Sequence, residues 1–348
     1  MDVNQRRFLE PISKPVLKWV LIRASALMCL LCSTGLSWAS SQTPLATSVV
    51  SAETPASRLT LVYEVGQTAT YCLSSETTKS VRFEGIRPDD NVLAALDSAF
   101  TGRLTDVTWT QTVQAVDPNG QALVLIKIVG LNYQSYVKGD SVLDYDSTRA
   151  QNKATTLKDL IGLVYRIRVD VKGQVVQVLD ADEALKKLTQ GKAHFNSAAD
   201  LVSEKVIRAR HTVKPLNGAP DQAMKHDTWT SAESFLFGSL GGKGFKKTYV
   251  CQGAGKDSSL VEISMTGSES VDKSVSSVST PRLPLTSENQ FTGTLTLDTR
   301  TGQIKMYRES LEVTWSLVYP ASVAEAQPHK SHMTARQAFL LERKESVQ

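Results

Sequence analysis

Apolar and polar residues alternate along several segments of the chain, most clearly over residues 307–319, YRESLEVTWSLVY. Successive side chains of a β-strand point to opposite faces, so alternation predicts a strand with one buried and one solvated face. The apolar and aromatic residues of this segment are Tyr307, Leu311, Val313, Trp315, Leu317 and Tyr319. A second alternating segment, LTDVTWTQTVQAV (104–116), places Val107, Trp109, Val113 and Ala115 on one face. Both patterns are typical of an antiparallel sheet that is packed on one side.

Three short turns share a pattern in which Asp precedes a Gly-Gln pair. They are AVDPNGQALV (115–124), RVDVKGQVVQV (168–178) and TLDTRTGQIKM (296–306). Gly adopts the positive φ that short hairpin loops require, and Asp accepts hydrogen bonds from the backbone of the turn that it opens. The pattern predicts hairpins that join 104–116 to 121–129, 164–170 to 174–179, and 291–298 to 302–319. A calcium site at Asp170 or Asp298 would need neighbouring acidic ligands, which these turns lack.

Helical spacing and capping residues predict a few short helices around these strands. They cover 88–100, 155–163, 180–191, 196–210 and 331–344. The last segment, SHMTARQAFLLERK, has Thr334 and Gln337 at capping-box spacing, which predicts a short helix in a C-terminal tail (321–348). The predicted fold class is mainly β, or α+β, with a twisted and curved antiparallel sheet. Two similar halves, 58–210 and 211–320, would build this sheet, with the helices at its periphery.

The N-terminal 39 residues have the features of a secretory signal peptide. Basic residues end at Arg23, an apolar run follows (24–39), and Ser37 and Ala39 are placed as in a small-x-small cleavage site. The apolar run is shorter than the roughly 20 residues of a transmembrane helix. An uncleaved membrane anchor is the alternative. Residues 40–57 are rich in Ser, Thr, Ala and Pro and predict a flexible linker. The expected location is periplasmic or extracellular.

Charge and cysteine content fit an exported protein without a nucleic-acid partner. Residues 1–39 hold five of the 39 basic side chains and two of the 35 acidic ones, so the remaining chain is nearly neutral. Nucleic-acid binding requires a concentrated basic face. Cys72 and Cys251 remain after removal of the signal peptide, and such a pair in an oxidising compartment predicts a disulfide. Two free thiols, packed as small apolar residues, are the alternative.

Catalytic and metal-binding motifs are absent from the sequence. The Gly-rich GSLGGKGF (238–245) lacks the spacing of a phosphate-binding loop, and no GxSxG nucleophile motif occurs. His329 and His332 form an HxxH without a third ligand, so neither a metal nor a cofactor is expected. His226 and Asp227 are neighbours on an expected strand and would point to opposite faces, so a hydrolase centred on His226 ranks last.

Three tryptophans on expected strands are the remaining candidates for a binding site: Trp109, Trp229 and Trp315. Large aromatic residues on strands commonly fill a core. The alternative is that these three line the concave face of a curved sheet that holds an apolar ligand.

The segment LKDLIGLVYRIRVDVKGQVVQVLDADEALKKL (157–188) resembles a family of uncharacterised, exported bacterial β-rich proteins, with a domain of unknown function. LVYEVGQTATY (61–71) and GTLTLDTRTGQIKMYRESLEV (293–313) fit the same layout, so the resemblance spans roughly 58–320. It implies a location in the cell envelope and supplies no catalytic residue. The architecture is also similar, more weakly, to periplasmic lipoprotein carriers, whose curved sheet binds acyl chains.

The sequence therefore favours an exported, non-enzymatic binding or scaffold protein of the bacterial cell envelope. The alternative function is a periplasmic carrier of an apolar, lipid-like ligand. The expected partner is an apolar small molecule or an envelope protein, and membrane contact is expected only through an uncleaved signal.

Overall fold

The structure is a computed structural model that describes residues 56–84, 100–152, 156–189, 197–237, 242–254, 259–270, 285–319 and 329–345. The predicted signal peptide, most of the predicted linker and the predicted helix over 88–100 (except Phe100) lie outside these residues. Residues 53–348 form one compact unit. Within the described ranges, no helix is both long and apolar enough to span a membrane.

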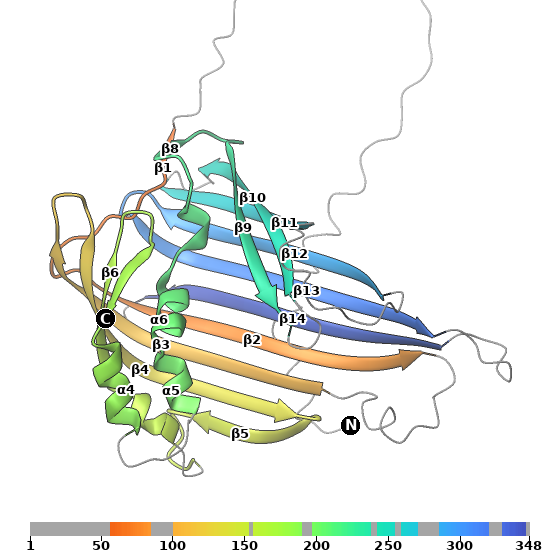
Figure 1. The fold of residues 1–348 in the computed structure, drawn as a ribbon. Helices are drawn as coiled ribbons and strands as arrows, with labels where there is room; N and C mark the ends of the chain where they lie inside the picture. Colours follow the sequence, from red (N-terminus) through yellow and green to blue (C-terminus); the bar gives the residue numbers. More distant parts are fainter. Residues whose placement is uncertain are drawn as a thin grey trace, which may run out of the picture. The chain divides into compact units, whose positions relative to one another are not determined.

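Twelve antiparallel strands form one large sheet (Figure 1), which confirms the predicted fold class. The strands of the N-terminal part are β2 (Thr68–Glu84), β3 (Phe100–Val116), β4 (Ala122–Val137), β5 (Asp140–Asp146), β6 (Val164–Val169) and β7 (Val175–Leu179). Those of the C-terminal part are β9 (Thr228–Leu236), β10 (Gly242–Ala254), β11 (Leu260–Ser270), β12 (Leu285–Asp298), β13 (Gln303–Tyr319) and β14 (His329–Lys344). The strand order is β7-β6-β4-β3-β2-β14-β13-β12-β11-β10-β9, with β5 paired to β4. A separate two-stranded sheet joins β1 (Ser57–Arg58) to β8 (Gln222–Ala223).

The C-terminal segment is a central strand of the sheet, so the predicted helix over 331–344 is wrong. Strand β14 pairs with β13 on one side and with β2 on the other, and it joins the two parts into one sheet. Ala335 and Leu341 face the core, whereas Arg343 and Lys344 are exposed. The capping-box spacing describes only local preference, and pairing on both strand edges satisfies far more backbone groups than an isolated helix would.

The three Asp…Gly-Gln turns are confirmed as hairpin loops. They connect β3 to β4, β6 to β7, and β12 to β13, as the sequence predicts. In each turn an Asp Oδ1 atom accepts two backbone hydrogen bonds of 2.8–3.2 Å from residues two to four positions later. The turn glycines all have positive φ: Gly120 (80°), Gly173 (73°) and Gly302 (63°).

These turns gather around residues 59–67, hereafter the 59–67 segment, which precedes β2. Leu61 N donates to Val171 O in the second turn (2.8 Å), and Val62 N donates to Gly302 O in the third (3.0 Å). The first turn reaches the second, because a Cβ atom at Gly120 would lie 2.7 Å from Val171 Cγ1. The 59–67 segment therefore crosses the end of the sheet that holds the β6–β7 and β12–β13 turns.

Replacing Gly302 with alanine is expected to reduce the free energy of unfolding by about 2–3 kcal/mol, because a Cβ atom there meets both a positive φ and a close neighbour. That atom would lie 2.6 Å from Val62 N. Gly139 is the matched control: its φ is +85°, and a Cβ atom there would have no neighbour within 4 Å. Urea unfolding should show a smaller loss for Gly139→Ala, about 1 kcal/mol. Equal losses would contradict a tight contact between Gly302 and the 59–67 segment.

Three short helices lie over the sheet at its β4–β6 end (Figure 1). Helix α4 (Ala181–Thr189) matches the prediction for 180–191. The predicted helix over 196–210 is instead two helices, α5 (Ser197–Val202) and α6 (Glu204–His211), separated at Ser203, which has extended φ/ψ. Short 3₁₀ helices occupy Thr156–Leu160 (η1), within the predicted helix over 155–163, and Lys214–Leu216 (η2).

The sheet curls at its other end, so that β9 and the residues after it lie over β13. The ring of Phe237, directly after β9, is 5.0 Å from the ring of Trp315 on β13, although three strands separate β9 from β13 in the sheet order. In Figure 1, β9 crosses in front of the neighbouring strands. This curl covers part of the apolar face, and the helices cover another part.

Candidate functional site

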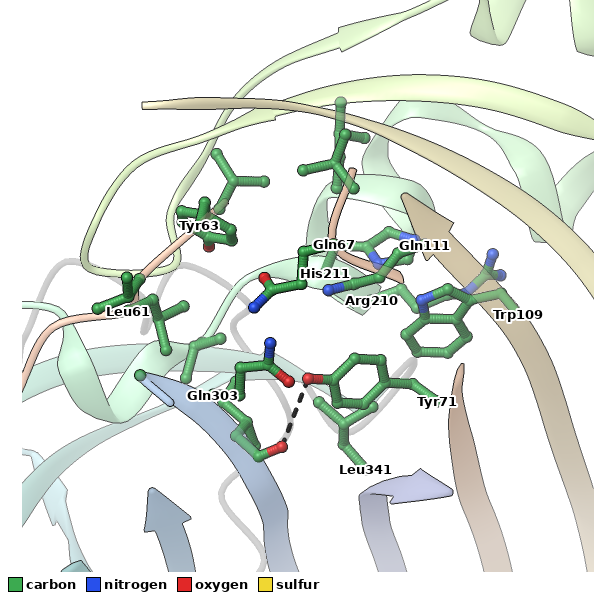
Figure 2. Close-up of a pocket in the computed structure, with 17 residues that line it drawn as sticks. Leu61, Tyr63, Gln67, Tyr71, Trp109, Gln111, Arg210, His211, Gln303 and Leu341 are labelled. Atoms are coloured by element: carbon green, nitrogen blue, oxygen red, sulfur yellow. Dashed lines mark hydrogen bonds between the residues drawn. The ribbon is translucent and has the colours of Figure 1, made fainter. Parts of the chain in front are cut away.

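A partly open pocket lies between the 59–67 segment, the end of α6 and the buried face of β2, β3 and β13 (Figure 2). Its cavity volume is about 60 Å³. Most of its wall is apolar: Leu61, Val62, Val124, Ile167, Val169, Val213, Ile304 and Leu341. Apart from Gly302, the remaining lining residues are polar or aromatic, and their side chains carry hydrogen-bonding groups.

Three glutamine side chains line this pocket and have no hydrogen-bond partner among the residues that the structure describes. Gln67, Gln111 and Gln303 all line it, and Figure 2 shows their amides directed toward a common space beside the Tyr71 hydroxyl. No hydrogen bond joins any of the three amides to another described residue. Gln303 is only 8% exposed, and its Oε1 atom is fully buried. A buried polar atom without a partner costs about 1–3 kcal/mol, so the Gln303 amide in particular is suited to bind a polar group that enters the pocket.

Trp109 adds a fourth unpaired polar group. Its side chain is 2% exposed, and its Nε1 atom is buried without a hydrogen-bond partner among the described residues. The Tyr71 and Trp109 rings stack with a centroid distance of 6.0 Å and form an aromatic wall. The Tyr71 hydroxyl donates to Ile304 O at 3.4 Å. Burial raises the pKa of Tyr71 to about 12, so the hydroxyl stays protonated at neutral pH.

The ionisable residues at the far side of the pocket are already engaged. His211 Nε2 lies 2.8 Å from the Tyr165 hydroxyl, and burial, reinforced by Arg210, holds the pKa of His211 well below 6.5. The imidazole is therefore neutral at pH 7. Arg210 is 7% exposed; it donates to Leu201 O in the last turn of α5 (2.6 Å) and to the Tyr165 hydroxyl (3.3 Å). The Arg210 cation satisfies a carbonyl at a helix C-terminus, where positive charge is favourable.

A second polar group of residues, hereafter the Lys247 cluster, is buried on the same face between β9, β10 and β13. Lys247 is 0% exposed, and its Nζ atom lies 2.5 Å from Glu233 Oε2 and 2.9 Å from Glu309 Oε2. The ammonium also lies 4.7 Å from the centroid of the Phe291 ring. Tyr307 donates its hydroxyl proton to Glu309, and Lys214 pairs with Glu233.

The charges of the Lys247 cluster balance, since two lysines face two glutamates. Burial alone would raise the pKa of Glu233, but Lys214 and Lys247 outweigh burial and hold that pKa below its ordinary value. The cluster joins the curled end of the sheet to β13 and lines no part of the pocket described above. We assign it a structural role.

The three tryptophans singled out in the sequence occupy separate places. Trp109 lines the pocket. Trp229 stacks on Tyr249 (5.7 Å between centroids), and its Nε1 donates to Pro215 O at 2.8 Å. Trp315 is buried against Phe237. A ligand-lining role therefore stays a prediction for Trp109, and the other two tryptophans lie among core residues.

The predicted disulfide between Cys72 and Cys251 is wrong, since both thiols are free. Cys72 lies on β2 beside the core-facing Tyr71 and therefore points to the other face, whereas Cys251 on β10 is fully buried in the core. Four strands separate β2 from β10 in the sheet order, whereas a disulfide requires Cα atoms within about 7 Å.

The histidine motifs do not form a common site. His226 lies in an exposed turn with a left-handed backbone (φ 76°), where Asp227 Oδ2 accepts a hydrogen bond from Met224 N. The HxxH pattern falls within β14, where His332 Nδ1 lies 2.8 Å from Ser316 Oγ. Asp170 and Asp298 accept backbone hydrogen bonds in their turns.

Neither the three pocket glutamines (Gln67, Gln111 and Gln303) nor the Lys247 cluster is among the site residues predicted from the sequence. The sequence does contain a signal for two of these residues. Gln111 in 104–116 and Glu309 in 307–319 stand at positions where the alternation would place an apolar, core-facing residue. Lys247 interrupts the alternation of Phe245, Tyr249 and Cys251 in the same way. A polar residue in the apolar phase of a strand must find a partner inside the protein or bind something there.

No family model and no curated protein matches the sequence, so the resemblance to an exported bacterial family stays a prediction. One solved structure that this chain is similar to is titled "Lipid-protein interactions in lipovitellin". The identity is 12% and the TM-score is 0.39. The match covers 81% of this chain and 25% of that one, so the chain spans about a quarter of the length of its relative. At this similarity, lipovitellin says nothing about the ligand of this chain.

Proposed function

We propose that this chain is an exported, non-enzymatic binding protein of the cell envelope. Its ligand is an uncharged amphipathic molecule that inserts a small polar group into the pocket beneath the 59–67 segment. The observation that carries the proposal is the convergence of unpaired polar groups there: three glutamine amides and the Trp109 indole N–H. The export signal in the sequence supports the location.

The composition of the wall supports an amphipathic ligand. Binding pockets typically combine an apolar lining with a few polar groups that orient the ligand, as this pocket does. Its volume is smaller than the roughly 300 Å³ at which drug-sized pockets begin. An entire acyl chain does not fit, so the pocket holds one end of the ligand and the rest extends outside. This geometry favours recognition of a terminal group over enclosure of a lipid.

Native mass spectrometry of the full chain, exported and purified without detergent, tests the proposal. We expect a non-covalent adduct on the wild-type protein. The adduct should be lost from Gln111→Leu, whose side chain lines the pocket, and retained by Gln114→Leu, which changes an exposed glutamine of the same strand. A bare mass for all three proteins, or equal loss from both variants, would overturn the proposal.

A further inference from the structure

The hydrogen-bonding groups of the pocket are amides that can donate and accept at the same site. Each glutamine carries one carbonyl oxygen and one NH₂ group, and the Trp109 indole adds a donor. A ligand group that only accepts or only donates would leave part of this set unpaired. A secondary amide has one N–H, which can donate to a glutamine carbonyl, and one C=O, which can accept from a glutamine NH₂ group.

The pocket offers no anionic partner, and its one charged lining residue among the described residues, Arg210, already donates to acceptors within the protein. No Asp, Glu or Lys is among its lining residues within the described ranges. His211 is neutral at pH 7, and the Arg210 guanidinium is bonded to Leu201 O and the Tyr165 hydroxyl. Burying an unpaired carboxylate or ammonium is strongly unfavourable. The polar end of the ligand is therefore uncharged.

The volume limits the size of the inserted group. A cavity needs roughly 10–15 Å³ of this kind of volume for one water molecule, so about 60 Å³ admits about four to six heavy atoms. An acetamido group has four heavy atoms, and its methyl group suits the apolar wall of Val213, Ile304 and Leu341. The Tyr71 and Trp109 rings, which stack on each other, add an aromatic part to this wall.

We propose that the pocket recognises the acetamido group of an N-acetylated amino sugar. Gln67, Gln111 and Gln303 bind the amide, and Trp109 contributes its N–H and one face of the wall. This inference rests on the proposed function and narrows the ligand to one chemical class.

The indole N–H signals of the ¹⁵N-labelled full chain provide the test. Trp109→Phe identifies the Trp109 signal, and Trp229, bonded to Pro215 O, and Trp315, outside the pocket, serve as internal controls. N-acetylglucosamine should shift the Trp109 signal saturably, with a dissociation constant on the order of 1 mM, as expected for a fragment-sized ligand. Glucose lacks the acetamido group and glucosamine carries an ammonium instead, so neither should shift it.

The variants separate recognition from folding. We expect Gln111→Leu to weaken N-acetylglucosamine binding roughly tenfold, because the Leu side chain leaves the amide of the sugar without its partner. Gln114→Leu should bind as the wild type does. The Trp229 and Trp315 signals report that both variants are folded.

Three results would overturn the inference. The first is a shift of the Trp109 signal by glucose that equals the shift by N-acetylglucosamine. The other two are tighter binding than that of N-acetylglucosamine, either by glucosamine or decanoate, or by Nε-acetyl-lysine, which carries the same amide on a peptide side chain. If no sugar shifts the Trp109 signal while the native adduct depends on Gln111, the sugar class is wrong and the proposed function stands. If the native adduct is absent as well, both the sugar class and the proposed function are contradicted.

Discussion

Replacing Lys247 with methionine is expected to lower the free energy of unfolding by about 3–5 kcal/mol, as measured by urea denaturation. The side chain is completely buried, and its ammonium compensates Glu309, which is 5% exposed. Methionine fills a similar volume, so the loss does not come from a cavity. It comes from the Glu309 carboxylate, which remains buried with the Tyr307 hydroxyl as its partner.

Two further variants isolate this cause. Lys246→Met changes the preceding residue of β10, which points to the exposed face, and should alter stability by less than about 0.5 kcal/mol. Lys247→Met combined with Glu309→Leu removes both charges, so the double variant should be more stable than Lys247→Met alone. Glu309→Leu alone completes the cycle: if the loss in the double variant equals the sum of the losses in Lys247→Met and Glu309→Leu, Lys247 and Glu309 do not form a coupled pair.

Local patterns predicted the ranges of six of the twelve strands of the large sheet and three of the connections between them. Residues 307–319 alternate so regularly that only one register puts Val313 and Trp315 in the core. The Asp and Gly positions of the turns fix the hairpins because both residues act within a few positions of each other. The sequence could not show that two of these turns meet the 59–67 segment, since that contact joins residues more than 100 positions apart.

The C-terminal segment shows where local patterns mislead. Thr334 and Gln337 have the spacing of a helix start, yet both lie in the middle of β14, opposite Thr314 and Leu311 of β13. The register of β14 with β2 depends on residues 246 to 274 positions away in the chain. Propensity is a weak prior that such pairing overrides.

In the sequence, the only sign of the candidate site is a polar residue that interrupts a series of alternating apolar positions. Gln111 and Glu309 both break an apolar face, but the sequence does not tell which interruption finds a partner. In the structure, Glu309 pairs with Lys247, whereas the Gln111 amide lines the pocket and has no hydrogen-bond partner among the described residues. Two similar patterns thus have different consequences. The curl of the sheet brings Lys247 to Glu309, which gives an ion pair, whereas Gln111 lies in a polar pocket.

Replacing Trp315 with alanine is expected to lower the free energy of unfolding by about 3–5 kcal/mol, as for other buried aromatic residues. Its ring is 3% exposed and packs edge-on against Phe237, so removal leaves a cavity between β13 and the curled end of the sheet. Trp315 does not line the pocket. Ligand binding, measured by the Trp109 indole signal under conditions where the variant is still folded, should therefore stay close to the wild-type value.

Trp109→Phe should give the opposite result to Trp315→Ala: a smaller loss of stability and a larger loss of ligand binding. Phenylalanine keeps an aromatic ring beside Tyr71, so the stability loss should be smaller, about 1–2 kcal/mol. It lacks the indole N–H, so the native adduct should weaken. A ligand that depended equally on Trp109, Trp229 and Trp315 would instead require a hollow apolar face. A loss of binding in Trp315→Ala without a loss of stability would therefore favour a lipid carrier and contradict a site confined to the pocket.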